Sequence, residues 1–532
     1  MVFDRIIRGG WIVDGTGAGR RKGDVGIVGD EIVAIGDLSG AEAEDIVDAA
    51  GKAVCPGFID VHVHSELALL GGPDRYAPLR MGVTTQLASP DGFSWAPLDR
   101  TRLGEMKQYL RPFYEDGFIE EGRDLSLDDF LALFRGNLPS NLVLQAPHGS
   151  VRQAVLGWET RAATDEEIGR MDRLVREWME RGAKALATGL EYEPMRRADL
   201  RELVALSRAA AAYGGIYVAH QRGYADKVTI GCEETFAIGL QADIPVHISH
   251  LTVDPAAASE LDRGGKLGAD ISFDMYPYPA GSTHLLLNLP EAAQAGTPKQ
   301  VRERLADPAF RKRIEAEVER AFPEERIRFA SVGRVRSDWE QGQIVIGSSP
   351  PDWLTDATTW EGKLLGEVRR ELGIGLTDFI CDLIVHTEYP SLMIFHWPEE
   401  RYPYLEPTFK HPLHMVGTDG IYAGAKPHPR GFGSYPNIFR RIVRENGWLT
   451  LEQAVRKMTA YPAERFGIKR RGKLAPGLYA DIVVFDETEI RDRATFAEPR
   501  LAPEGVEHVL VNGRFAIRDG VIQQGLHGRI VE

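Results

Sequence analysis

The stretch Pro56-Gly-Phe-Ile-Asp-Val-His-Val-His64 determines how the rest of the chain is interpreted. From Phe58 onward it is apolar and alternating, which predicts a β-strand. His62 and His64 are two positions apart, so both imidazoles point to the same face of that strand. Two neutral imidazoles on one face at a strand end suit Zn²⁺. A pair of surface histidines is the alternative at this point.

Two further histidines close later predicted strands, each preceded by a predicted helix. His220 ends the strand 216–220, and His250 ends the strand 245–250. In a parallel barrel all strand carboxyl ends meet at one rim, where active sites lie. We therefore expect a single metal site built from four histidines: His62, His64, His220 and His250.

The middle of the chain alternates predicted helices and strands. A capping box at Thr164 and Glu167 predicts one helix, Asp199 starts the next, and a third lies around 233–240. Strands separated by one helix each predict parallel βαβ units. A segment of this length fits an α/β fold, a (β/α)8 TIM-like barrel, with an insertion near 285–375.

Both ends of the chain read as short strands broken by turns. Residues 1–55 and 470–532 together predict one small composite β-sandwich domain, and residues 56–469 predict the barrel. The 532 residues therefore predict a barrel plus a split β domain rather than three or four independent units.

Composition excludes several classes of protein. The net charge of −15 argues against nucleic acid or an anionic membrane as a partner. No apolar run approaches the 18 or more residues of a membrane span. The three cysteines cannot form a disulfide framework, and the N-terminal stretch lacks the apolar core of a secretory signal. We therefore expect a cytoplasmic protein, and homo-oligomerisation stays open.

Asp419 is the candidate proton carrier. It closes an apolar stretch that begins at Met415, and Gly420 follows it. An aspartate at the end of a late barrel strand can take a proton from an attacking water. A turn-forming Asp-Gly pair is the commoner meaning of this dipeptide, so the expectation depends on the barrel context.

Several motifs resemble a known family. The Pro56–His64 stretch, the split β domain and the late Asp419 resemble the amidohydrolase superfamily. Further stretches resemble its D-aminoacylase (N-acyl-D-amino-acid deacylase) branch: Gly189-Leu-Glu-Tyr192, His220-Gln-Arg222, Ile248-Ser-His-Leu251, Asp274-Met-Tyr-Pro-Tyr278, Ala280-Gly-Ser282, Pro427-His-Pro-Arg430 and Lys473–Phe485. The resemblance extends from the N-terminal strands to about residue 520.

The resemblance implies a role for each matching residue. His62 and His64 serve one metal position, His220 and His250 serve the other, and the cofactor is one or two Zn²⁺ ions. Asp419 is the general acid/base. Three residues approach polar groups of the substrate: Tyr192, Tyr276 and Ser282. His428 and Arg430 lie in a candidate substrate loop after Asp419.

The chain departs from the branch pattern at two positions. Asp91 stands where the branch has a metal-binding cysteine. A carboxylate can also bridge two ions, but as a harder ligand it favours Mn²⁺ more than a thiolate does. Glu191 is the competing carboxylate. Thr252 stands where the branch commonly has a lysine suited to the substrate's carboxylate, and Arg222 and Arg430 are the nearest basic replacements.

The sequence thus predicts a metal-dependent hydrolase that cleaves an amide (N-acyl) bond of a small, N-acyl-amino-acid-like molecule. Thr252 leaves open a cyclic amide or lactone hydrolase, or a deaminase, on the same metal site. A non-catalytic scaffold of the same fold is the alternative of another class. The complete set of four histidines with Asp419 argues against it.

Overall fold

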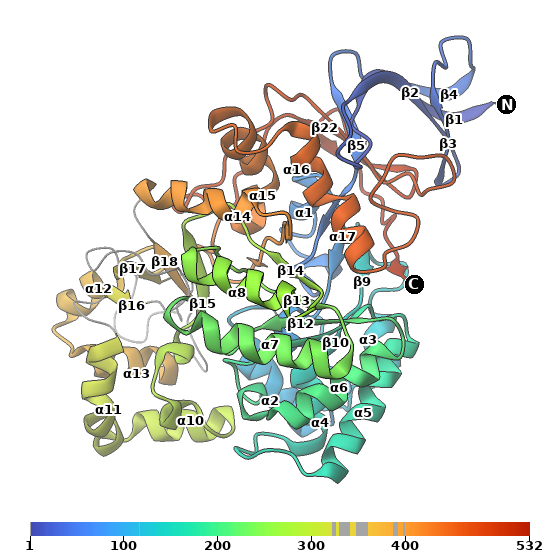
Figure 1. The fold of residues 1–532 in the computed structure, drawn as a ribbon. Coiled ribbons are helices and arrows are strands. Elements are labelled where there is room, and N and C mark those ends of the chain that lie inside the picture. Colours follow the sequence, from blue (N-terminus) through green and yellow to red (C-terminus); the bar gives the residue numbers. More distant parts are fainter. Residues whose placement is uncertain are drawn as a thin grey trace.

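The computed structural model describes residues 2–115, 117–321, 326–328, 341–346, 360–386, 392–396 and 399–532. The predicted α/β fold class is confirmed: a parallel barrel is joined to a β sheet assembled from both ends of the chain (Figure 1). None of the helices in these ranges is both long and apolar enough to cross a bilayer.

Within the described residues, eight strand positions form the barrel, if consecutive short strands are taken together. In chain order they are β6 (Phe58–Asp60) with β7 (Val63–His64), β8 (Val83–Leu87), β9 (Asn141–Val143) with β10 (Ala146–Pro147), β11 (Ala185–Gly189), β12 (Ile216–His220), β13 (Val246–Ile248), β14 (Ile271–Asp274), and β19 (His414–Met415) with β20 (Gly420–Ile421). All neighbouring pairs are parallel.

The ring closes between the first and the last strand. Gly420 and Ile421 of β20 pair with Val63 and His64 of β7. The Asp419 N–H also donates to the His62 carbonyl at 2.7 Å. The first and eighth strands are therefore direct neighbours, although most of the chain lies between them.

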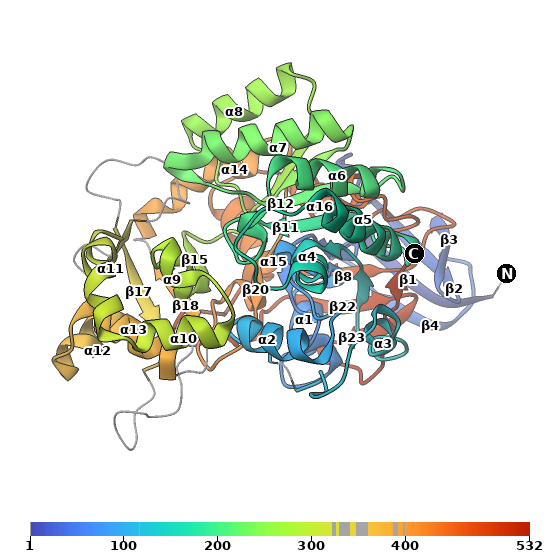
Figure 2. The same cartoon turned by 90° about the horizontal axis from the view of Figure 1, so that it is seen from below.

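Helices cover the outside of the barrel (Figures 1 and 2). They are α2 (Arg100–Leu110), α3 (Leu127–Ala132), α4 (His148–Leu156), α5 (Asp165–Glu180), α6 (Leu200–Ala211), α7 (Val228–Ala242), α8 (Pro255–Lys266), α14 (Glu406–Lys410), α15 (Arg430–Asn437), α16 (Leu451–Met458) and α17 (Ala460–Arg465). Helix α5 begins at the predicted capping box, where Thr164 accepts from the Glu167 N–H and Glu167 accepts from the Thr164 N–H. Its apolar stripe, with Met171 and Trp178, is buried against the barrel.

The barrel interior is a packed apolar core. Its buried strand residues are Ile59, Val61, Leu87, Val143, Ala185, Ala187, Ile216, Val218 and Met415. Ala463 and Phe466, from α17 and the residue after it, belong to the same cluster, as does Val531. Val531 lies in β25 (Ile530–Val531), which pairs with β9. These residues close the end of the barrel where the strands begin, which leaves the opposite rim for a site.

Both ends of the chain contribute to one nine-stranded sheet. Its strands are β1 (Phe3–Ile12), β2 (Arg21–Val28), β3 (Glu31–Gly36), β4 (Ala43–Asp48), β5 (Ala53–Pro56), β21 (Ile482–Phe485), β22 (Val506–Val511), β23 (Arg514–Arg518) and β24 (Val521–Ile522). The two ends join where β5 pairs with β21. Side chains from both ends share one core, including Ile27, Val54 and Val484.

An inserted segment separates β14 from β19. It carries the antiparallel sheet β15 (Ala280–His284), β18 (Leu392–His396), β17 (Gln341–Ile346) and β16 (Arg326–Arg328), with helices α9 (Glu291–Gln294), α10 (Pro298–Ala306), α11 (Pro308–Ala321), α12 (Leu365–Leu372) and α13 (Leu376–His386). Of the predicted insertion 285–375, residues 322–325, 329–340 and 347–359 lie outside the described residues. Figures 1 and 2 both show this segment on the side of the barrel away from the terminal sheet.

Candidate metal centre

The predicted ligands converge at the carboxyl ends of the barrel strands. His62 and His64 end the first strand, His220 is the last residue of β12, and His250 follows β13. Asp91 lies in the turn after β8, and Asp419 lies between β19 and β20. Four histidines and two aspartates from five strand ends therefore face one point, as the sequence predicts.

The carboxylate oxygens lie between the imidazoles. Asp91 Oδ1 is 3.6 Å from His62 Nε2, and Asp91 Oδ2 is 3.7 Å from His64 Nε2. Asp419 Oδ1 is 3.6 Å from His62 Nε2 and 3.3 Å from His64 Nε2. On the other side, His220 Nδ1 lies 3.1 Å from His250 Nε2 and 3.9 Å from Asp91 Oδ1.

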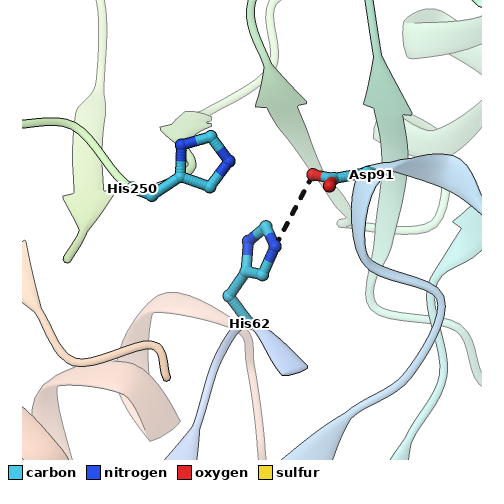
Figure 3. A group of neighbouring side chains, drawn as sticks. All are labelled: His62, Asp91 and His250. Atoms are coloured by element: carbon cyan, nitrogen blue, oxygen red, sulfur yellow. Dashed lines mark ion pairs between the residues drawn. The ribbon is translucent and has the colours of Figure 1, made fainter. Parts of the chain in front are cut away.

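This donor set fits a divalent cation. Ligand atoms of His62, Asp91 and His250 lie within 4.8 Å of one another, and so do those of His62, His64 and Asp419. Figure 3 shows the first group pointing inward from separate segments of the chain. His62 Nε2 and Asp91 Oδ1 are buried without a hydrogen-bond partner in the described part of the structure. Buried polar atoms of this kind are costly unless something binds them, and an ion between them would.

Burial also keeps two of the imidazoles neutral. It lowers the pKa of His62 to about 3 and the pKa of His250 well below its ordinary value. Neutral imidazole is the form that binds metals. Burial raises the pKa of Asp91 to about 6, against the opposing attraction of His220 and His64.

Three residues of this histidine and aspartate cluster have a left-handed backbone conformation. The φ angles are 55° at Asp91, 39° at His250 and 48° at Asp419. Non-glycine residues rarely adopt this conformation, and its energetic cost is typical of functional sites. Two glycines permit the close packing: a Cβ at Gly92 would meet the Ala187 carbonyl at 2.7 Å, and one at Gly417 would meet His62 Cβ at 2.7 Å.

Two buried aspartates orient the strand ends. Asp274 accepts the His250 N–H at 3.0 Å and pairs with His247 Nε2 at 2.9 Å. Asp60 accepts both the N–H and the hydroxyl of Thr418, at 2.9 and 2.6 Å. These contacts fix the segments that carry His250 and Asp419.

Arg430 holds Asp419 in its ionised form. Arg430 Nη1 lies 2.9 Å from Asp419 Oδ2, and both side chains are buried. Burial alone raises the pKa of Asp419, but Arg430 and the neighbouring histidines hold that pKa far below its usual range. Asp419 Oδ2 is thus engaged, whereas Oδ1 faces His62 and His64.

Glu191, the competing carboxylate, contacts His220 on the side of the imidazole ring that faces away from Asp91. Its Oε2 lies 2.9 Å from His220 Nε2, the nitrogen opposite the one that faces Asp91. Burial opposes protonation of His220, but the hydrogen bond that His220 donates to Glu191 raises the pKa of this histidine above its ordinary value.

Five residues of the cluster line a pocket of about 950 Å³ that opens to solvent: His64, Asp91, His220, His250 and Asp419. Its walls are mainly aromatic and apolar, and they include Tyr192, Tyr276 and Ser282 from the predicted substrate set. Tyr192 hydroxyl pairs with Thr283 Oγ1 at 3.0 Å, whereas Ser282 Oγ is buried without a hydrogen-bond partner among the described residues. Arg430 stacks over the Tyr276 ring at 4.6 Å.

Three predicted substrate residues lie outside the pocket lining: Arg222, His428 and Arg430. Arg222 binds Glu234 at 3.0 Å and donates to the carbonyls of Arg196 and Ala198. His428 is fully buried and pairs with the Ala280 carbonyl at 3.2 Å. Their guanidinium and imidazole groups support the walls of the site.

Sequence reasoning missed three residues that contact the ligands or their loops. Asp274 ends a strand and stands within a quoted family motif, so its position could have identified it. Tyr114 lies 2.9 Å from His64 Nδ1, and Glu66 accepts the N–H of Ser89. No periodic pattern marks these two, because their role depends on how distant segments pack.

Comparisons with known proteins place the chain in a family. The model described as "Amidohydrolase family" matches residues 45–325 and 400–517. An N-acyl-D-glutamate deacylase and a D-aminoacylase of Alcaligenes xylosoxydans xylosoxydans are 32% and 33% identical to this chain. The alignments cover 96% of this chain in both cases, and 93% and 94% of the relatives.

Solved structures agree. The N-acyl-D-glutamate deacylase of Bordetella bronchiseptica, complexed with zinc and a phosphonate mimic of the tetrahedral intermediate, superposes with a TM-score of 0.81 at 31% identity. A D-aminoacylase structure gives 0.80 at 30% identity, and both cover 100% of each chain. The predicted family and the predicted enzyme class, a metal-dependent hydrolase, are thereby confirmed. The chain belongs to the amidohydrolase family and is similar over its full length to D-aminoacylases.

Proposed function

We propose that the protein is a metal-dependent hydrolase that cleaves the N-acyl amide bond of a small, N-acyl-amino-acid-like molecule. One observation carries the proposal: His64, Asp91, His220, His250 and Asp419 line one pocket of about 950 Å³, and His62 Nε2 lies 3.6 Å from both aspartates. The deacylase names of the full-length relatives support an N-acyl substrate. A cytoplasmic location belongs to the same proposal.

The metal ligands of the proposal are His62, His64, Asp91, His220 and His250. These residues would hold a divalent cation, which when bound would supply polarisation of the amide carbonyl and lower the pKa of the attacking water toward about 7. Asp91 presents one oxygen to His62 and the other to His64, so one ion or two could be held. Zn²⁺ is the expected ion, and the carboxylate also suits Mn²⁺.

Asp419 moves the proton. Because Arg430 occupies Oδ2, Oδ1 is the oxygen that takes a proton from the attacking water and passes it to the leaving nitrogen. Tyr276 and the free Ser282 hydroxyl, both in the pocket wall, orient polar groups of the substrate. Arg430 contributes through Asp419 and Tyr276.

Replacing Asp419 tests the proton carrier. We expect Asp419→Asn to lower kcat by about 10²–10⁴-fold, because proton transfer is lost while the shape of the side chain is kept. Turnover of a panel of N-acyl amino acids measures the effect. Asp519→Asn is the matched control, since Asp519 also has positive φ but its side chain is 80% exposed. Full activity in Asp419→Asn would contradict the assignment.

Metal removal tests the cofactor. Dialysis against a chelator should abolish turnover, and added Zn²⁺ or Mn²⁺ should restore it. Elemental analysis of the purified protein counts the ions in parallel. The same preparation, assayed on cyclic amides, lactones and aminated heterocycles, separates the amide proposal from the alternatives on the same site. Unchanged turnover in metal-free protein would contradict the metal-dependent mechanism.

A further inference from the structure

The two ring nitrogens of His64 face different surroundings. Nε2 lies among carboxylates, 3.3 Å from Asp419 Oδ1 and 3.7 Å from Asp91 Oδ2. Nδ1 points away from them and lies 2.9 Å from the Tyr114 hydroxyl. A neutral imidazole carries one N–H and one lone pair, so the partner of Nδ1 determines what Nε2 offers to the site.

Aromatic side chains hold the His64 ring in place. Phe113 stacks on it with ring centres 5.2 Å apart and an interplanar angle of 29°. Tyr114 meets it edge-on at 5.5 Å. Phe113 and Tyr114 follow α2 in the chain and are 2% and 3% exposed. The imidazole therefore cannot turn over, and the Tyr114 contact is a fixed one.

The side of His64 that faces the site determines the direction of the hydrogen bond at Nδ1. Nε2 is the nitrogen that lies near the carboxylates of Asp91 and Asp419, so a cation held there would take its lone pair. The one proton of the neutral imidazole is then on Nδ1. The Tyr114 hydroxyl oxygen, 2.9 Å away, is placed to accept it.

We propose that Tyr114 is a positioning residue that keeps the proton of His64 on Nδ1 and so presents the Nε2 lone pair to the metal. The inference rests on the proposed metal-dependent function and adds a residue that neither the sequence pattern nor the ligand set identifies. Partners of this kind, behind a metal-binding histidine, typically contribute 10–100-fold to metal affinity.

Glu66 supports the turn of the second carboxylate. By accepting the Ser89 N–H it holds the turn that carries Asp91. Ser89 itself has a φ of 59°, so the turn is strained and needs such an anchor. A residue two positions after His64 thus holds the segment that carries Asp91.

Tyr114→Phe is the direct test, because it removes one hydroxyl and keeps the ring. Zn²⁺-loaded protein is mixed with excess chelator, and ion release is followed with a colorimetric zinc indicator. We expect the variant to lose Zn²⁺ about 10–100-fold faster than the parent protein. Tyr109→Phe is the matched control: Tyr109 is 2% exposed on α2, and its hydroxyl faces Glu193 rather than a ligand.

Thermal unfolding of the metal-free proteins separates positioning from simple packing. The positioning role predicts similar midpoints for Tyr114→Phe and Tyr109→Phe, with fast Zn²⁺ release in the former alone. A lowered midpoint with release at the parent rate would overturn the inference.

The outcomes also distinguish this inference from the proposed function. A parent protein that binds no Zn²⁺ or Mn²⁺ would remove the proposed function itself, and the inference with it. A parent protein that binds metal and turns over substrate, with unchanged release in Tyr114→Phe, would overturn the inference alone.

Discussion

Asp91 would give the proposed metal centre its individual chemistry. It lies in a turn with left-handed backbone, and its two oxygens face His62 and His64 separately. A carboxylate is a harder ligand than a thiolate and tolerates oxygen-preferring ions better. The choice of metal should therefore depend on this side chain more than on the histidines.

Substituting Asp91 tests that dependence. We expect Asp91→Asn to lower metal content, because a neutral amide replaces the charge that the cation needs. Asp91→Cys should retain metal but shift its preference from Mn²⁺ toward Zn²⁺. Elemental analysis after equilibration with equal amounts of both ions measures the shift. Identical metal ratios in the parent and the cysteine variant would contradict it.

At the residue scale, the sequence predicted what strand parity and strand ends can reveal. His62 and His64 both face Asp419 Oδ1, His220 ends β12, and His250 lies two residues after the end of β13. Arg222 was predicted to approach the substrate, yet its guanidinium binds Glu234. That pairing depends on how α7 packs after β12, which the local sequence does not encode.

At the scale of elements, the contact between the first and last barrel strands positions Asp419. Thr418 stands just before it, and its N–H and hydroxyl both donate to the buried Asp60 carboxylate. Asp60 also accepts the His62 N–H at 3.3 Å. One carboxylate thereby ties the strand that carries His62 to the strand that carries Asp419.

Removing the Thr418 hydroxyl should loosen this tie. Thr418→Val keeps the volume but leaves a buried carboxylate oxygen without its partner, at a cost of about 1–3 kcal/mol. The midpoint of thermal unfolding should fall, and turnover should fall with it. Thr418→Ser keeps the hydroxyl and is the control. Equal midpoints for the two variants would show that the hydrogen bond contributes little.

Elements with local signals were predictable, and those built from distant pairings were not. The capping box at Thr164 and Glu167 correctly predicts the start of α5, since both partners lie within one turn. The sheet of β15 to β18 was not predicted. Its strands β15 and β18 pair Ala280 with His396, so nothing local indicates their register.

At the scale of the molecule, the end of the barrel opposite the site is closed by late segments of the chain. Strand β25 pairs with β9, and the Leu142 N–H donates to the Arg529 carbonyl at 2.9 Å. Asn512, from the terminal sheet, donates to Asn141 Oδ1 at 2.8 Å. The split β domain and the barrel are thus joined by specific contacts.

Val531 offers a test of this closure. It is 5% exposed in the apolar cluster at the base of the barrel, so Val531→Ala should cost about 2 kcal/mol, at about 0.8 kcal/mol per methylene-sized group plus the cavity. Val521→Ala is the control, because Val521 is 63% exposed and its loss should change stability by less than about 0.5 kcal/mol. Chemical denaturation measures both; equal effects would argue against a structural role for β25.

The pairing of β20 with β7 has a consequence for how the enzyme matures. The two halves of the site lie at opposite ends of the barrel segment, so the chain between them must be in place before His64 and Asp419 meet. Contacts this distant in sequence form late and slowly. A partly synthesised or partly folded chain therefore lacks the proposed proton carrier Asp419 beside His64, and the onset of turnover should mark the completion of the ring.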